Sequence, residues 1–155
     1  MSAHYPTPDA LDSILVPIDG SDAAHAALEY ALVLAEPYGA AVHVLTVVDP
    51  SGNPLAFGVG EVDELNRAAQ TIVDELVEAY VDHAVEVHGA VRRGRPYRQI
   101  LAYADEMGID LLVVGRTGAQ GVSRSLVGST TDRLIRSSSI PVTVVPSGTG
   151  GANGG

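Results

Sequence analysis

Five short apolar runs alternate with longer segments of helical periodicity, and this alternation constrains the fold more than any other feature of the sequence. The apolar runs cover Ser13–Ile18, Ala41–Val48, Ala84–Val91, Ile109–Val114 and Pro141–Val145. The helical segments cover Asp22–Tyr38, Glu61–His83, Pro96–Met107 and Gly128–Ser138. Apolar strands separated by helices form parallel sheets that are covered on both faces. With right-handed crossovers, the pattern predicts one Rossmann-like α/β domain: a doubly wound, open sheet of five parallel strands in the order 3-2-1-4-5.

The chain has the length of one domain. Its 155 residues fit a single folding unit, and a hydrophobic content of 46% is enough for a packed core. We expect the ordered domain to span residues 13–146, with a flexible N-terminus at 1–12 and a disordered, glycine-rich tail at 147–155. Glycine, asparagine and proline at 51–60 predict a loop after the second strand.

Composition excludes several classes of function. No apolar run reaches the roughly 20 residues that a membrane-spanning helix requires, so no membrane partner is expected. The N-terminus lacks the basic-then-apolar order of a signal peptide, which predicts a cytoplasmic protein. Because the chain has no cysteine, it can form no disulfide, no thiolate metal site and no cysteine nucleophile.

The charge of the chain is strongly unbalanced. The formal net charge is −10, and all nine basic residues are arginine. Such a surface repels nucleic-acid backbones, so we expect no binding of DNA or RNA. The lack of lysine also excludes a P-loop, which requires Gly-Lys-Ser/Thr. An acidic, lysine-free composition resembles that of proteins from salt-loving microbes, in which concentrated salt screens the repulsion between carboxylates.

A spaced set of glycines follows the fourth predicted strand. Gly115 and Gly118 come directly after the apolar run, and Gly128-Ser129-Thr130 opens the next helix. A glycine at the end of a parallel strand lets the backbone approach a ligand without a Cβ in the way. Unpaired amides at a helix start, with two hydroxyl groups beside them, suit a phosphate. The segment therefore predicts a site for a phosphorylated small molecule.

A second segment is expected to face the same site. Asp19-Gly20-Ser21 follows the first strand, which neighbours the fourth strand in the predicted order. Ligands of open α/β sheets bind beyond the carboxyl ends of the strands, where the strand order reverses. Each segment also has a plainer interpretation, because Asp19-Gly20 can be an ordinary turn and Ser21 or Ser129-Thr130 can simply cap a helix. Their convergence on one crevice is stronger evidence for a ligand site than either segment alone.

These motifs resemble the ATP-binding branch of the universal stress protein family, over about Ser13–Pro146. The resemblance rests on Val16-Pro17-Ile18-Asp19-Gly20-Ser21, on His43-Val44-Leu45-Thr46-Val47-Val48-Asp49, on the G-x2-G-x9-G-S/T pattern of Gly115, Gly118, Gly128 and Ser129, and on Ile140–Pro146. Many members carry Ser-His where this chain has Arg116-Thr117, a departure that places a cation near the phosphates.

The resemblance implies a site for ATP, with Mg²⁺ held mainly by the phosphates. Asp19 would form a hydrogen bond to the ribose or lie near the metal. The backbone of Val47 would contact the edge of the adenine, and Val114 would pack near the base. The glycines and hydroxyl groups would contact the ribose and phosphates, with Arg116 or Arg124 as a nearby cation. The implied binding residues are Pro17, Asp19, Val47, Val114, Gly115, Arg116, Gly118, Gly128, Ser129 and Thr130.

The sequence thus predicts an ATP-binding module of stress response or signalling with at most slow hydrolysis, because no general base for the γ-phosphate can be identified. Two alternatives remain open. One is a true ATPase or phosphotransferase that uses Asp19 as its base, and the other is a nucleotide-free dimerisation or signalling module. The resemblance also implies a homodimer, in which the apolar edge strand Pro141–Val145 pairs with its counterpart in a second copy.

Two further groups of residues carry no specific signal. The chain has one basic cluster, which we expect to be a solvated patch that offsets nearby carboxylates; it consists of Arg92, Arg93, Arg95 and Arg98. Four histidines lack the spacing of metal ligands and are expected to lie on the surface or pack against neighbours; they are His25, His43, His83 and His88.

Overall fold

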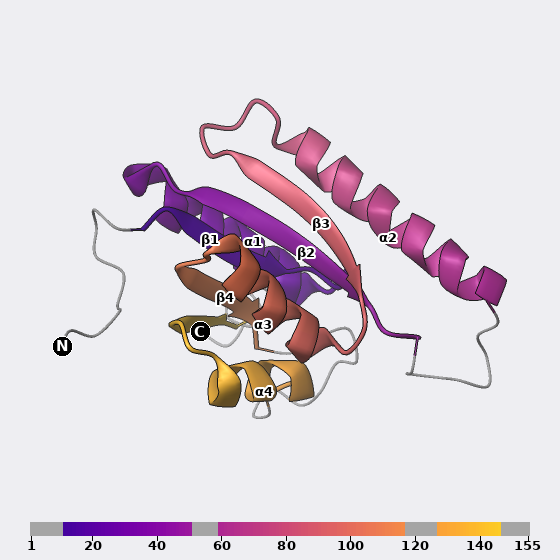
Figure 1. Cartoon of the computed structure of the whole chain (residues 1–155). Coiled ribbons are helices and arrows are strands. Elements are labelled where there is room, and N and C mark those ends of the chain that lie inside the picture. Colours follow the sequence, from indigo (N-terminus) through magenta and orange to yellow (C-terminus); the bar gives the residue numbers. More distant parts are fainter. Residues whose placement is uncertain (1–10, 51–58, 117–126, 147–155) are drawn as a thin grey trace.

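The computed structural model describes residues 11–50, 59–116 and 127–146 (Figure 1). The elements are β1 (Ser13–Pro17), α1 (Asp22–Ala35), the short 3-10 helix η1 (Glu36–Tyr38), β2 (Ala41–Val48), α2 (Val59–Ala79), β3 (Val87–Arg93), α3 (Pro96–Met107), β4 (Leu111–Gly115), α4 (Ser129–Ser137) and β5 (Val142–Val145). The N-terminus predicted at 1–12 and the tail predicted at 147–155 lie outside the described residues, except for Leu11 and Asp12.

The five strands form one parallel sheet in the order β3-β2-β1-β4-β5, which confirms the predicted topology. The order reverses between β1 and β4, and the Asp110 carboxylate links the starts of these two strands. Asp110 precedes β4, and its Oδ2 accepts hydrogen bonds from the amides of Asp12 at 2.8 Å and Ser13 at 3.2 Å. Segments nearly a hundred positions apart in the chain are thereby held side by side at the centre of the sheet.

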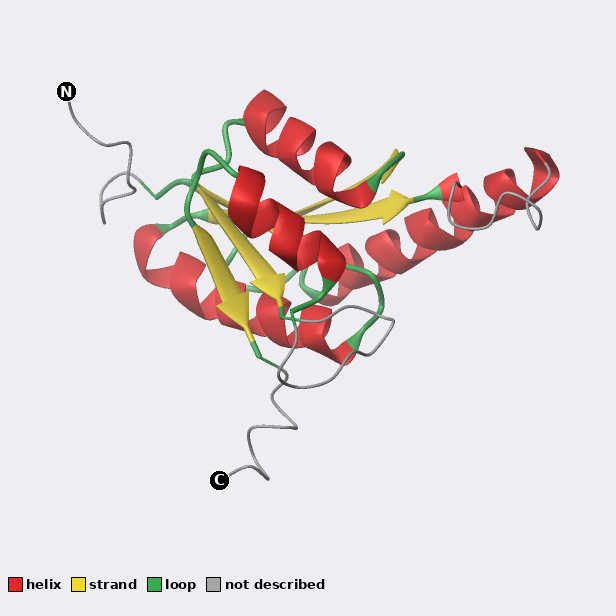
Figure 2. Cartoon of the chain, turned by 90° about the horizontal axis from the view of Figure 1, so that it is seen from below, coloured by secondary structure: helices red, strands yellow, loops and turns green. Residues whose placement is uncertain are grey.

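Helices cover both faces of the sheet, so successive strand residues enter two different cores (Figure 2). Ile14 and Val16 of β1 join the core beneath α1 and α2, whereas Leu15 joins the core beneath α3 and α4. All three side chains are fully buried. Because both faces of each central strand are apolar, the strand sequences are continuous hydrophobic runs instead of alternating ones.

The second crossover differs from the sequence prediction at its end. The helix expected at 61–83 ends at Ala79, and the strand expected at 84–91 begins at Val87. Between them the chain forms a turn, in which Nδ1 of His83 accepts a hydrogen bond from the amide of Val85 at 3.0 Å. Val85 is buried and anchors this turn to the core beneath α1 and α2. No glycine or proline marks the turn, which is why the sequence did not reveal it.

The edge strand β5 is short and its side chains are half-buried. It pairs with β4 on one side, and Leu112 donates its amide to the carbonyl of Pro141 at 3.0 Å. In a parallel ladder successive residues direct their backbone groups to opposite sides. The amides of Val142 and Val144 therefore face away from β4, at the open edge of the sheet. Within the described ranges, no helix has both the length and the apolarity needed to cross a bilayer.

Candidate functional site

A cavity of about 400 Å³ lies beyond the carboxyl ends of β1 and β4, at the point where the strand order reverses. Its walls come from β1, β2 and β4, the turn after β1, and the starts of α1, α3 and α4. The lining residues are Pro17, Ile18, Asp19, Ser21, Ala24, Leu45, Val47, Pro96, Ile100, Val114, Gly115, Gly128, Ser129, Thr130, Thr131 and Leu134. This size lies in the range of small-molecule sites, which are usually concave and largely apolar.

Most of the predicted binding residues line this cavity. They are Pro17, Asp19, Val47, Val114, Gly115, Gly128, Ser129 and Thr130. Arg116 is not among the lining residues, and its Nε is buried with no hydrogen-bond partner in the described part of the chain. Gly118, together with the alternative cation Arg124, lies outside the described residues.

The sequence did not indicate the contribution of α3. Pro96 and Ile100, one turn apart on this helix, line the cavity. Ile100 is nearly fully buried and belongs to the core beneath α3 and α4. The only available signal was the right-handed crossover, which puts α3 and α4 on the same face of the sheet.

The turn after β1 combines a local structural role with exposure to the cavity. Oδ1 of Asp19 accepts a hydrogen bond from the amide of Ser21 at 2.9 Å, and Gly20 between them has a φ of 83°. Oγ of Ser21 then caps α1 by accepting a hydrogen bond from the amide of Ala24 at 3.1 Å. The plain turn-and-cap interpretation is therefore correct, and the same turn carries the Asp19 carboxylate to the cavity wall.

Val47 has backbone groups directed toward the cavity. The carbonyl of Leu45, two residues earlier, accepts a hydrogen bond from the amide of Ile18 at 2.8 Å. Odd-numbered residues of β2 therefore direct their backbone groups toward β1. β1 ends at Pro17, and the amide and carbonyl of Val47 have no partner among the described residues. An unpaired donor and acceptor on one edge of a strand can bind the edge of a planar heterocycle.

The start of α4 directs unpaired amides into the cavity. The amide of Gly128 donates to the carbonyl of Arg116 at 2.8 Å, so it is not available to a ligand. The next three amides, those of Ser129, Thr130 and Thr131, have no acceptor within the described ranges. No side chain caps this helix, because its N-cap residue is a glycine. The predicted set of unpaired amides is present, but it begins one residue later than expected.

Gly115 is required by packing against α1. A Cβ built at this position would lie 2.8 Å from the Cβ, the carbonyl carbon and the carbonyl oxygen of Ala23. The sequence interpretation held that glycine here lets the backbone approach a ligand. The structure supplies a different reason, which is the close approach of α1 to β4. The Gly115 carbonyl also accepts a hydrogen bond from Oγ1 of Thr131 at 2.7 Å, which fixes α4 to β4.

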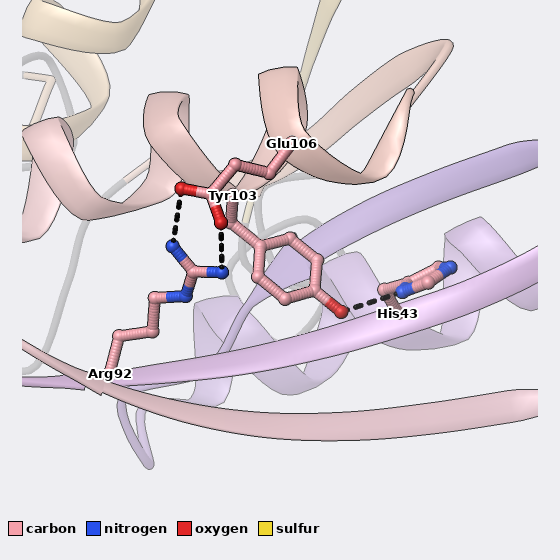
Figure 3. Close-up of polar contacts among 4 residues, drawn as sticks. All are labelled: His43, Arg92, Tyr103 and Glu106. Carbon is pink, nitrogen blue, oxygen red and sulfur yellow. Dashed lines mark hydrogen bonds and ion pairs between the residues drawn. The ribbon is translucent and has the colours of Figure 1, made fainter.

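A polar cluster connects β2, β3 and α3 on the face of the sheet that α3 covers, and it extends from buried Tyr103 to exposed Glu106 (Figure 3). Arg92 makes two hydrogen bonds to Glu106, at 2.8 and 3.0 Å, and its guanidinium lies 5.0 Å from the Tyr103 ring centre. The Tyr103 hydroxyl lies 2.7 Å from Nδ1 of His43, and the His43 ring lies 5.1 Å from the His88 ring, centre to centre, at an angle of 43°. Burial, and then the neighbouring His88, lowers the pKa of His43.

This cluster agrees with the plain expectations for the arginines and histidines. The hydrogen bonds from Arg92 lower the pKa of Glu106, and Arg92 thus offsets a carboxylate as predicted. His43 has a packing role. No group of three or more histidine, aspartate or glutamate side chains in the described part of the chain is arranged to hold a metal ion.

Comparison with known proteins identifies similar chains. The sequence profile of the universal stress protein family matches residues 11–146. Universal stress protein MJ0531 of Methanocaldococcus jannaschii is 32% identical over 136 residues, which cover 85% of this chain and 80% of that protein. Universal stress protein UspA from Lactobacillus plantarum is 30% identical, with a TM-score of 0.75 over 87% of this chain and 97% of that structure. A universal stress protein in complex with cAMP is 26% identical, with a TM-score of 0.68 over 88% and 97% of the two chains.

Proposed function

This chain belongs to the universal stress protein family, and from that premise we propose that its cavity binds an adenine nucleotide, with ATP as the principal ligand. The proposal rests on the fact that one cavity has an apolar region at one end and unpaired hydrogen-bond donors at the other. One end has apolar walls and the unpaired backbone of Val47, and the other end has the unpaired amides at the start of α4. The related structure in complex with cAMP supports an adenine nucleotide as the ligand class.

The base fits the apolar end. Val114 is nearly fully buried and, with Pro17 and Leu45, forms a wall against which a flat ring can pack. The amide and carbonyl of Val47 supply one donor and one acceptor at the edge of this wall. A purine edge with one acceptor and one donor matches that pair, because buried polar groups on both partners are then satisfied.

The phosphates fit the start of α4. Three unpaired amides at a helix N-terminus, reinforced by the helix dipole, attract an anion without any lysine. The hydroxyl groups of Ser129 and Thr130 line the same end of the cavity. Mg²⁺, held mainly by the phosphates with Asp19 as the neighbouring carboxylate, would neutralise part of the phosphate charge.

A binding module with at most slow hydrolysis fits this site better than an enzyme. Asp19 is the only acidic or basic side chain among the residues that line the described cavity. Its Oδ1 already accepts the amide of Ser21, an arrangement that holds the carboxylate in the turn. A phosphotransferase would need a base or a positioned water beside the γ-phosphate. We propose that the protein acts in the cytoplasm as a nucleotide-dependent stress-response or signalling module.

We also propose a homodimer that forms through Pro141–Val145. The outward amides of Val142 and Val144 lie at the open edge of the sheet, where a second copy can add its own β5 strand. An unprotected apolar edge strand invites pairing, and isologous pairing about a twofold axis closes the assembly at two chains.

Nucleotide extraction and calorimetric titration test the binding proposal. Purified protein is denatured, and the released small molecules are separated by chromatography; we expect ATP or another adenine nucleotide. Titration with Mg-ATP is then compared between the wild type, Gly128→Val and Gly118→Val. The backbone of Gly128, with φ −60° and ψ 153°, is accessible to valine, so this substitution adds bulk beside the amides without backbone strain.

A matched control carries valine at the other end of α4. Ser137→Val changes an exposed residue of the same helix and should leave affinity unchanged. If Gly128→Val and Gly118→Val bind Mg-ATP as the wild type does, with unchanged circular dichroism, the glycine motif does not form the site. A wild type that neither releases nor binds nucleotide would favour the nucleotide-free module.

A further inference from the structure

Two arginines beside the cavity have no carboxylate partner in the described part of the chain. Arg92 and Arg136 form ion pairs with Glu106 and Asp132. Arg98 and Arg133 instead lie against an aromatic ring, although acidic residues outnumber basic ones by 19 to 9. Because no carboxylate of the described residues pairs with these guanidinium groups, their positive charge can attract an anionic ligand.

The two guanidinium groups meet at one side chain, that of Tyr97. The central carbon of Arg133 lies 4.9 Å from the centre of the Tyr97 ring, and that of Arg98 lies 5.8 Å from it. Nε of Arg98 also donates a hydrogen bond to the Tyr97 hydroxyl at 3.1 Å. The hydrogen bond from Arg98 lowers the pKa of Tyr97, and the charge of Arg133 acts in the same direction. Both cations are therefore held in place by one ring, and not spread over the surface.

Tyr97, Arg98 and Arg133 do not line the cavity themselves, but they adjoin residues that line it near the start of α4. Tyr97 directly follows Pro96, which lines the cavity from the first turn of α3. Arg133 follows Ser129 by four positions on α4, so it lies one turn further along the same helix face. Ser129 lines the cavity and is exposed, so the cavity opens to solvent there. The contact between Tyr97 and Arg133 thus joins the two helices whose starts form this end of the cavity.

We propose that Arg98 and Arg133 form an outer phosphate rim that makes the cavity select nucleotides with two or three phosphates over those with one. The inference rests on the proposed nucleotide site, in which the amides of α4 hold the first phosphate. A longer phosphate chain that extends from this point toward solvent would approach the two guanidinium groups, which adjoin the lining residues Pro96 and Ser129. Arginine suits this role because its planar fork binds phosphate oxygens in pairs.

The expected effect follows from the exposure of both arginines. An exposed ion pair contributes modestly, so we expect each arginine to raise ATP affinity by about two- to fivefold and to leave AMP affinity nearly unchanged. The ratio of ATP affinity to AMP affinity is therefore the quantity to measure. Because a merely structural contact between α3 and α4 would change both affinities together, this ratio separates the two roles.

Calorimetric titrations with AMP, ADP and ATP in one magnesium-containing buffer test the proposal. The proteins are the wild type, Arg98→Gln, Arg133→Gln and the double variant, with Arg136→Gln as the control. Arg136 lies on the same helix, about two turns from Ser129, and is already paired with Asp132, so its loss removes an equal charge that is not held against Tyr97. Melting curves of each variant report any loss of folding. We expect the ratio of ATP affinity to AMP affinity to fall by about fourfold or more in the double variant and to stay constant in the control.

Each other outcome decides a different claim. If AMP and ATP bind the wild type and the ratio is unchanged in the double variant, the phosphate rim is refuted while the nucleotide site stands. If the control lowers the ratio as much as the rim variants, general charge is responsible and the rim is refuted. If the wild type binds none of the three nucleotides, the proposed function itself fails, and the rim fails with it.

Discussion

Replacing Gly115 by alanine should destabilise the protein, although glycine is usually the costlier residue in a strand. The added Cβ would lie 2.8 Å from three atoms of Ala23, two of which belong to the backbone. Carbon atoms in contact prefer separations of about 3.5–4.0 Å. A backbone carbonyl group cannot rotate out of the way as a side chain can, so α1 and β4 must move apart.

The net cost follows from two opposing terms. Overpacking of a tight core contact costs about 1–3 kcal/mol. Gly115 has no positive φ, so alanine fits its backbone conformation and stabilises by about 0.4–1 kcal/mol through the unfolded chain. The midpoints of these two ranges differ by about 1.3 kcal/mol, so we expect a loss of about 1–2 kcal/mol. For a domain of this size, that loss lowers Tm by about 2–8 °C.

Thermal and urea unfolding of Gly115→Ala measure this loss. The double variant Ala23→Gly/Gly115→Ala serves as an internal control. It removes the Cβ of residue 23 and leaves the carbonyl carbon and oxygen in place, so it should not restore full stability. A Tm for Gly115→Ala equal to or above that of the wild type would refute the packing argument. The ligand-approach interpretation of this glycine would then regain its support.

Three other predictions concern pH, salt and assembly. Because burial lowers the pKa of His43 below its ordinary value of 6.5, the unfolded chain binds this proton more readily, so stability should be constant above about pH 6.5 and fall below it. Urea unfolding at pH 7.5 and 5.5 checks the direction, and a variant His43→Gln should show a smaller drop. If repulsion among the excess carboxylates limits stability, Tm should rise from low to molar KCl, and a flat or falling Tm would contradict this. Val144→Pro removes one outward amide of β5 and should convert the proposed dimer into monomers in sedimentation velocity; a wild type that is monomeric at tens of micromolar, a rough expectation for an interface of ordinary size, would count against the dimer.

The topology was predictable because few arrangements satisfy the strand sequences. Strands as apolar as Ile14–Val16 and Leu112–Val114 must lie inside a sheet covered on both faces, and right-handed crossovers limit the strand order. The end of α2 was not predictable, because the side chain of His83 forms the turn through its contact with Val85. Such a contact depends on the local geometry of the folded chain and has no fixed sequence signature.

The candidate site was predictable where it depends on strand ends. Asp19 and Gly128 line the same cavity because β1 and β4 are neighbours in the sheet, and the predicted strand order already required this. The sequence could not predict the contacts that depend on how closely the helices approach the sheet and one another. The neighbour of Gly115 is Ala23, and that of Tyr97 is Arg133. Both contacts join segments whose spacing is set only by the packed structure.

The hydrogen bonds that join Asp110 to the start of β1 also set the order in which the molecule can be assembled. They join residues 98 positions apart, and closing a loop of this length costs conformational entropy. Contacts between residues close in sequence form earlier in folding and do not offset this cost. A sheet whose central pair is also its most distant pair in sequence has high contact order, which slows folding. On the ribosome, β1 to β3 are made before β4, the partner that completes the centre of the sheet. The cavity beyond the opposite, carboxyl ends of β1 and β4 therefore forms only when nearly the whole chain has been made.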